Sequence, residues 1–229
     1  IKTELINNGV HPSLVNPSKD YLKKVINPSG RAYNRARKLY DKELKLAGKL
    51  KTKDQDISVI PDNVYLNPTT LTLPTMLYGY IDDYGDALTE AILSINVRSQ
   101  LSSVDKNFDT LYERTFAESL NLHLRCPNMV LGEVYLLPVK EYNDSVPVSF
   151  NPTNIEKYTE AFHAINARIG ATDEAYKYER CCLLLVDFDR PVPKVYNTTQ
   201  ELIDDGFLSP QTRCSMVNLG YQNFITDIL

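Results

Sequence analysis

The chain has 229 residues but no tryptophan, only nine glycines and only four cysteines. The cysteines form no CxxC pair, so the sequence offers no common zinc or disulfide motif, and we expect buried free thiols. No Walker loop, GxGxxG or GxSxG motif is present, and nine glycines are few for a protein that cradles phosphates in a loop. These absences argue against a nucleotide-binding enzyme and against a serine hydrolase.

Long apolar runs are missing as well. No run approaches the roughly 18 residues that a membrane-spanning helix needs, and no basic-then-apolar leader opens the sequence. We therefore expect a cytoplasmic location, while the first residue, Ile1, is compatible with an upstream segment. The content of 43% hydrophobic and 24% charged residues is typical of a globular protein.

Charge is distributed unevenly along the chain, although the net charge is only −4. Residues 1–53 contain 13 Lys and Arg against 4 Asp and Glu, a net charge of +9. The remainder contains 12 against 25, a net charge of −13. Such segregation favours a basic surface that binds a polyanion, beside an acidic body that attracts cations.

A basic helix is predicted within the N-terminal segment. The stretch "NPSGRAYNRARKLYDKELKLAGK" has a helix-start signal at Pro28 and Ser29 and a stop signal near Gly48. Its apolar residues recur every three or four positions, which predicts one buried face. A second stripe with the same spacing contains six cations: Arg31, Arg35, Lys38, Lys42, Lys45 and Lys49. Two interpretations are open for this stripe, a DNA-binding surface or an ordinary solvated helix face.

The rest of the chain predicts an α/β fold. Residues 52–74 predict a loop with short extended pieces. The segments "TMLYGYI" and "ALTEAILSINV" predict a β-hairpin, with a helix from Asp86 to Gln100 as the alternative. The later pattern predicts a helix at 107–124, a buried strand at "NMVLGEVYLLPV", a helix opened by a Thr153–Glu156 capping box, a buried strand at "CCLLLVDFD" and a short helix from Thr198 to Gly206. Together these elements predict a mixed sheet flanked by helices, with residues 1–51 as a helical arm packed on a core of residues 52–229.

Part of this core resembles a nuclease family. The segments "SINVRSQLSS", "KN", "TLYERTFAE" and "VLGEVYLLP", between Ala91 and Val139, are similar to type II restriction endonucleases. The order hairpin, helix, strand is also that of the PD-(D/E)XK core that most of these enzymes share. The resemblance implies a restriction-endonuclease-like fold, sequence-specific hydrolysis of double-stranded DNA with Mg²⁺, and a homodimer that matches two-fold symmetric sites.

The strand signature expected from this family, an acid, any residue and then lysine, is altered here. Asn96 stands where the lysine is expected. Lys106 and Glu113, seven residues apart on one face of the following helix, are candidates for a relocated lysine and acid. The alternative is an ordinary helix-surface salt bridge. The predicted catalytic residues are Lys106, Glu113 and Glu90, and the predicted Mg²⁺ ligands are Asp86, Glu90 and Glu113.

Candidate DNA contacts follow the same strand. Arg98, Ser99 and Gln100 could contact bases or phosphates, or could form a polar strand end packed on the next helix. The basic stripe would add phosphate contacts from Arg31, Arg35, Lys38 and Lys42. In the apolar strand, Glu133 is expected to need a partner, either an arginine or a backbone group, with a functional role as the alternative. On the preceding helix, His123 is expected to point into solvent. Two other functions stay open: a non-catalytic DNA-binding protein derived from a nuclease, and an interaction protein without nucleic acid.

Overall fold

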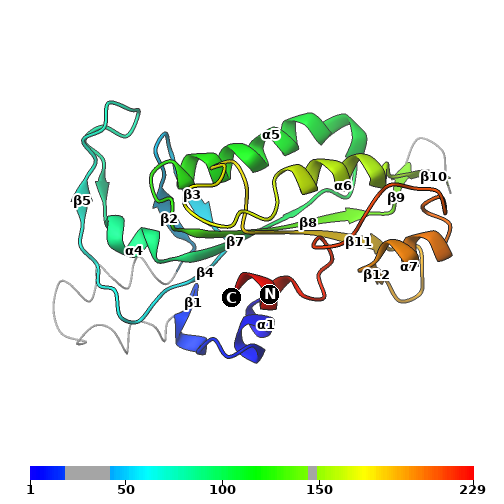
Figure 1. Ribbon diagram of the computed structural model, residues 1–229, viewed down its shortest axis with the longest axis horizontal. Helices are drawn as coiled ribbons and strands as arrows, with labels where there is room; N and C mark the ends of the chain where they lie inside the picture. The colour runs from blue at the N-terminus through cyan, green and yellow to red at the C-terminus, as the bar shows by residue number, and fades with distance from the viewer. Residues whose placement is uncertain (19–41, 144–148) are drawn as a thin grey trace. The chain divides into compact units, whose positions relative to one another are not determined.

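The computed structural model describes residues 1–18, 42–143 and 149–229 (Figure 1). These residues form an α/β architecture on a mixed sheet of six strands in the order β1, β4, β7, β8, β11 and β12. The strands are β1 (Val15–Asn16), β4 (Ile57–Val59), β7 (Leu93–Ser99), β8 (Val130–Pro138), β11 (Arg180–Asp187) and β12 (Lys194–Tyr196). The prediction of a mixed sheet flanked by helices is confirmed.

The other described elements are helices and three two-stranded sheets. The helices are α1 (Lys2–Asn7), a 3₁₀ turn (Pro12–Leu14), α4 (Asp86–Glu90), α5 (Val104–His123), α6 (Ile155–Ala164), α7 (Thr199–Asp204) and α8 (Phe224–Ile228). The small sheets pair β2 (Leu44–Ala47) with β3 (Thr52–Gln55), β5 (Thr69–Thr70) with β6 (Ile81–Asp82), and β9 (Lys140–Asn143) with β10 (Ser149–Pro152). Within the described ranges, no helix combines the length and the apolar character needed to cross a membrane.

The chain divides into two compact units. The first comprises Ile1–Asn96, Glu118–Gly132 and Ile169–Tyr176, and the second comprises Val97–Ala117, Glu133–Arg168 and Lys177–Leu229. Strands β7 and β8 and helix α5 each continue from one unit into the other. The predicted arm, residues 1–51, belongs to the first unit, and its residues 19–41 lie outside the described ranges.

The topology of the sheet centre follows from its pairings. Strand β4 pairs with β7 in antiparallel orientation, and the chain then passes through α5 and returns as β8. Backbone hydrogen bonds from Val130 to Ile92 and from Gln100 to Leu136 join β7 and β8 at opposite ends, so these two strands run in the same direction. A helix is the usual connection between parallel neighbours, because the chain must cross the length of the sheet.

Helix α5 confirms the helix predicted at residues 107–124. Phe108, Tyr112 and Phe116 are spaced by four residues, and each ring packs on the next with centroids 5.5 and 5.4 Å apart. At the first turn, the Val104 amide donates to the Glu141 carboxylate at 3.1 Å. This acid complements the positive end of the helix dipole and satisfies an amide that the helix itself leaves without an acceptor.

The core of the second unit forms around β11, of which all but one residue is buried. Helices α6 and α8 pack on this strand from opposite sides (Figure 1). Phe162 and Tyr158 of α6 are each 1% exposed, which confirms the helix phase expected from the sequence. Cys181 and Cys182 are free and buried, as predicted. Burial raises the pKa of the Cys182 thiol to about 12, so this side chain remains protonated and unreactive at neutral pH.

The predicted hairpin of "TMLYGYI" and "ALTEAILSINV" is wrong. The second segment begins as helix α4, which buries Leu88 and Thr89, and only its end forms β7. The antiparallel partner of β7 is β4, which lies in the region predicted as loop with extended pieces. Gly85, in the left-handed region with φ +77°, lies against the Asn67 carbonyl, and an ideal Cβ would be 2.0 Å from that oxygen. A turn that requires glycine therefore starts a helix in the segment predicted as a strand.

The predicted basic helix is wrong at its C-terminal end. Residues Leu44–Ala47 form strand β2, whose pairing with β3 buries Leu44, Leu46 and Ala47. The helical spacing of these residues was misleading because β2 places three of its four side chains in the core. The rest of the predicted helix up to residue 41 lies outside the described residues.

Two local predictions are corrected by hydrogen bonds. His123 is 2% exposed rather than solvent-facing, and its ring nitrogens lie 3.0 Å from the carbonyl oxygens of Ala175 and Met129. Helix α6 is capped by Asn154, which accepts from the Lys157 amide at 3.1 Å, and not by Thr153. The short helix predicted from Thr198 to Gly206 is present as α7, and a capping box of Thr198 and Glu201 opens it.

Candidate active site

The predicted catalytic residues and metal ligands lie at separate places in the chain. Lys106 and Glu113 lie on the exposed side of α5, within the second unit. In the first unit, Asp86 pairs with Arg125 at 2.5 Å, and Glu90 accepts from the Asn128 amide at 2.8 Å. Among the described residues, no group of three or more His, Cys, Asp or Glu side chains is arranged to hold a metal ion.

The predicted DNA contacts at the end of β7 make contacts inside the second unit. Arg98 donates to the Thr115 hydroxyl at 2.9 Å, and its Nε lies 3.2 Å from Glu133 Oε1. Glu133 therefore has the arginine partner that its burial requires. The Gln100 amide nitrogen donates to the carbonyls of residues 103 and 104 at the start of α5, and its oxygen accepts from Tyr135 at 2.8 Å. Ser99 is exposed.

Of the predicted basic stripe, Lys42 is exposed just before β2. Arg31, Arg35 and Lys38 lie outside the described residues.

A buried polar cluster surrounds Asn96, the position at which the resemblance places a lysine. We call it the Glu118 cluster; it comprises Lys53, Gln55, Ser94, Asn96 and Glu118. Asn96 Nδ2 donates to Glu118 Oε1 at 3.0 Å, and Gln55 Nε2 donates to the same oxygen at 3.3 Å. The Gln55 Oε1 atom accepts from the Ser94 hydroxyl at 2.6 Å and from Asn96 Nδ2 at 3.2 Å. Lys53 Nζ lies 2.7 Å from Glu118 Oε2.

Three elements of the first unit bring these side chains together. Strand β3 contributes Lys53 and Gln55, strand β7 contributes Ser94 and Asn96, and helix α5 contributes Glu118. Residues two apart on a strand point to the same face, so each strand presents a pair of polar groups.

The cluster is largely buried, and the negative charge of Glu118 is balanced by the positive charge of Lys53. Glu118 is 2% exposed, whereas 31% of the Lys53 side chain reaches the surface. A buried carboxylate is costly unless a cation and hydrogen-bond donors compensate it, and here Lys53 and two amide groups do so. Lys53 is therefore the one cation of the cluster that contacts both the buried acid and the solvent.

The donor atoms of the cluster fit a magnesium ion in their chemistry. Glu118 provides a carboxylate, Asn96 and Gln55 provide amide oxygens, and Ser94 provides a hydroxyl. Mg²⁺ prefers oxygen ligands and takes only one or two carboxylates, keeping several of its waters. Amide N–H groups face Glu118 Oε1 in this arrangement, so metal binding would require them to turn and present their oxygens.

Glu118 and Lys53 were not among the residues predicted from the sequence. A signal for Glu118 exists, because it lies three residues after Thr115 and four before Leu122, and both of these are buried. Helical periodicity thus places this acid on the inward side of α5, whereas Glu113 falls on the exposed side. Lys53 has no comparable local signal, because only the fold brings β3 to α5.

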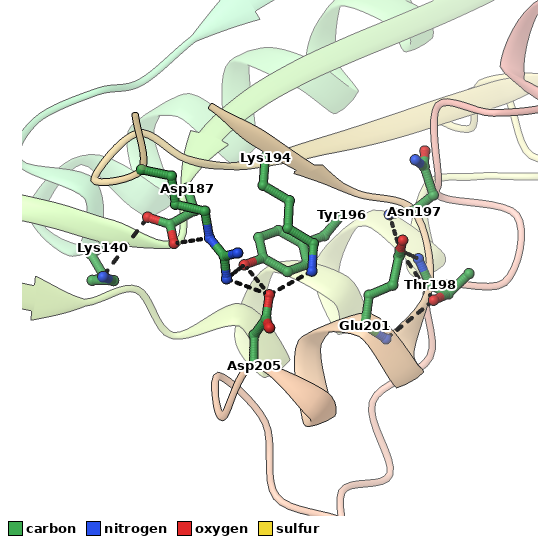
Figure 2. A network of polar contacts seen from close by, with 9 residues as sticks. Lys140, Asp187, Lys194, Tyr196, Asn197, Thr198, Glu201 and Asp205 are labelled. Atoms are coloured by element: carbon green, nitrogen blue, oxygen red, sulfur yellow. Dashed lines mark hydrogen bonds and ion pairs between the residues drawn. The ribbon is translucent and has the colours of Figure 1, made fainter. Parts of the chain in front are cut away.

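A second polar cluster lies in the second unit, at the ends of β11 and β12 (Figure 2). We call it the Asp205 cluster. It comprises Lys140, Asp187, Arg190, Lys194, Tyr196 and Asp205. Asp205 Oδ2 lies 2.6 Å from Lys194 Nζ and 2.6 Å from Arg190 Nη2, and it accepts from the Tyr196 hydroxyl at 2.7 Å. The hydrogen bonds from Lys194 and Tyr196 hold the pKa of the Asp205 carboxyl below its usual value.

A cavity of about 280 Å³ adjoins the Asp205 cluster. Its lining includes the aromatic rings of Tyr142, Phe150 and Phe188 and the charged groups of Lys140, Asp187 and Asp189. One cation against two carboxylates gives this lining a net negative charge, and Lys140 is already 3.0 Å from Asp189 Oδ2. The cavity is therefore a poor site for the phosphates of a nucleic acid.

A scan against protein-family models, a search of curated proteins and a search of solved structures each found no match. The functional argument therefore depends on the residues of the chain itself.

Proposed function

We propose that the protein is a sequence-specific, Mg²⁺-dependent endonuclease of double-stranded DNA, similar to type II restriction enzymes, with the Glu118 cluster as its active site. One observation carries the proposal: Asn96, which replaces the expected lysine, contacts an acid from the following helix, and that acid contacts Lys53. The acid and the lysine that the strand lacks are thus supplied by its neighbours.

The topology supports the same proposal. The antiparallel pair β4 and β7, the helix α5 and the parallel strand β8 follow one another in the order expected of a PD-(D/E)XK core. In that arrangement, the residues of β7 and of its neighbours form the reaction centre. We propose that this part of the sheet is a restriction-endonuclease-like core.

The roles of the cluster residues follow from their chemistry. Glu118, with the amide oxygens of Asn96 and Gln55, would hold Mg²⁺. When bound, the ion would activate a water molecule and neutralise charge that develops on the phosphate. Lys53, part-exposed beside Glu118, would donate a hydrogen bond to a phosphate oxygen and stabilise its increasing negative charge. Ser94 would position the Gln55 amide through the hydrogen bond that its hydroxyl donates to Gln55 Oε1.

DNA would be held by the basic N-terminal segment, which has a net charge of +9 over residues 1–53. We propose phosphate contacts from Arg31, Arg35, Lys38 and Lys42, with further contacts near Arg98 and Ser99. Four such contacts would give a slope of roughly −3.6 in log K against log salt, at about −0.9 for each. A homodimer would present two active sites to a symmetric DNA sequence.

The deciding experiment compares two acids on the same helix. We expect Glu118→Gln to slow Mg²⁺-dependent cleavage of plasmid DNA by about 100-fold or more, because the variant removes the only buried carboxylate of the cluster. Glu113→Gln, on the exposed side of α5, serves as the matched control and should retain activity. The reverse result would move the site to the set predicted from the sequence: Lys106, Glu113, Glu90 and Asp86. Absence of Mg²⁺-dependent cleavage by the unaltered protein would overturn the proposal.

The two lysines provide a second matched pair. Lys53→Met should slow single-turnover cleavage by about 100-fold, as expected for loss of one donor to the transition state. Its affinity for DNA without metal should fall much less, by no more than the loss of one phosphate contact among several. Lys106→Met, which removes an exposed lysine of α5, should leave the cleavage rate unaltered.

A non-catalytic DNA-binding protein is the second candidate. Its support is that both carboxylate oxygens of Glu118 already contact other side chains, namely Asn96, Gln55 and Lys53, which would compete with a metal ion. Salt-dependent binding of DNA without cleavage in Mg²⁺ or Mn²⁺ would establish this function instead.

A further inference from the structure

The hairpin formed by residues 63–81 differs in composition from the rest of the chain. These 19 residues contain no Asp, Glu, Lys, Arg or His, although charged residues make up 24% of the protein. Asp62 precedes the segment and Asp82 follows it. Six of the twenty exposed large hydrophobic side chains in the described residues belong to it: Tyr65, Leu73, Met76, Tyr78, Tyr80 and Ile81.

The hairpin has a defined backbone but no core. Strands β5 and β6 pair in antiparallel orientation (Figure 1). Hydrogen bonds from the Leu71 amide to the Tyr80 carbonyl at 2.9 Å and from the Gly79 amide to the Leu71 carbonyl at 2.8 Å extend the pairing. No residue from 61 to 81 is buried. A two-stranded hairpin without a packed face is only marginally stable in water. Burial of its apolar side chains against another molecule would therefore stabilise the hairpin.

The chemistry of the hairpin selects the kind of partner. A surface without a cation cannot neutralise DNA phosphates or lipid head groups, which basic side chains normally contact. It also offers no charge to a charged protein. The surface that fits best is equally apolar and equally free of charge. The next longest run of this chain without Asp, Glu, Lys, Arg or His is residues 214–226, and it buries its apolar side chains in its own unit: Met216, Leu219, Phe224 and Ile225.

We propose that this hairpin docks on the same hairpin of a second copy of the chain, in an isologous contact about a two-fold axis. Two identical surfaces without charge meet without like-charge repulsion, and each buries the apolar side chains of the other. The inference deepens the homodimer of the proposed function by assigning its interface, and its physical basis does not depend on catalysis.

Sedimentation velocity over a range of concentrations tests the interface. We expect the unaltered protein to dimerise and the double variant Met76→Asp, Tyr78→Asp to have a dimer dissociation constant at least about 100-fold higher, because two-fold symmetry places four carboxylates in one apolar contact. Ile169→Asp is the matched control, since Ile169 and Met76 are both 92% exposed. It should dimerise normally, and all variants should keep their melting temperature within a few degrees.

A cross-link tests the two-fold geometry directly. In a Cys214→Ser background, which removes the part-exposed thiol, Met76→Cys should form a disulfide-linked dimer under mild oxidation. A chain that is monomeric at 100 µM, or a double variant that dimerises like the unaltered protein, would overturn the interface. A monomer that still cuts DNA would refute the interface alone, whereas a dimer of this kind that cannot cut DNA would refute the nuclease alone.

Discussion

The Glu118 cluster and the Asp205 cluster both gather several donors around one carboxylate, but they place the charge differently. Glu118 is almost fully buried, and amide groups from two strands contact it. Asp205 is part-exposed at the C-terminal end of α7, where two cations and a tyrosine contact it. Water and salt screen a charge at the surface, whereas a buried carboxylate stays ionised only when cations and hydrogen-bond donors are held next to it. The buried cluster is therefore the stronger candidate for chemistry.

The largest expected difference between the clusters is in stability. Glu118→Ala should lower the free energy of unfolding by about 3 kcal/mol, because it leaves the buried donors of Asn96 and Gln55 without their common acceptor. Denaturant titration at pH 7 measures this loss. Asp205→Ala should change stability far less, and its effect should diminish as salt is added. Equal losses in the two variants would remove the distinction between the clusters.

Loss of one neutral hydrogen bond should have the next largest effect. Ser94→Ala removes the hydroxyl that donates to Gln55 at 2.6 Å in a fully buried position. We expect a loss of about 1 to 2 kcal/mol, which corresponds to several degrees in melting temperature for a domain of this size. Calorimetry of this variant would show whether the cluster is rigid; an unchanged transition would mean that water replaces the hydroxyl.

A smaller effect is expected when a cation is removed from the Asp205 cluster. Lys194→Met deletes a part-exposed lysine that lies 2.6 Å from Asp205. The loss should be at most about 1 kcal/mol at low ionic strength, and it should disappear in high salt. A loss that persists in 1 M NaCl would show that the cluster is more shielded from solvent than its exposure indicates.

The smallest effect concerns the capping box beside this cluster. Backbone N–H groups, first that of Asn197, lower the pKa of the Glu201 carboxyl below its usual value. A lowered folded-state pKa means that the stabilisation is present above the unfolded-state pKa of about 4.3 and is lost as the pH falls through the folded-state pKa. Glu201→Gln should therefore cost up to about 1 kcal/mol at pH 7 and nothing well below pH 4. Melting curves of both proteins from pH 7 to pH 3 should converge at the acid end.

Several elements could be predicted because their signal is local. Helix α5, strand β8, the Phe162 side of α6 and the α7 capping box follow from periodicity and capping residues, which adjacent side chains alone determine. The pairing of "TMLYGYI" with "ALTEAILSINV" and the C-terminal end of the basic helix were mispredicted, because tertiary pairing prevailed over local spacing. Strand β2 is the clearest case, because residues with helical spacing are buried by pairing with β3.

The sequence by itself determined the class of fold, the burial of Cys181 and Cys182 and the need of Glu133 for a partner. Only the tertiary structure decided which acid and which lysine meet Asn96. Lys53, Asn96 and Glu118 are separated by 43 and 22 residues along the chain, and they converge because β3, β7 and α5 pack together in the first unit. Periodicity reports the face on which a side chain lies, but the register and packing of distant elements determine which side chain it contacts.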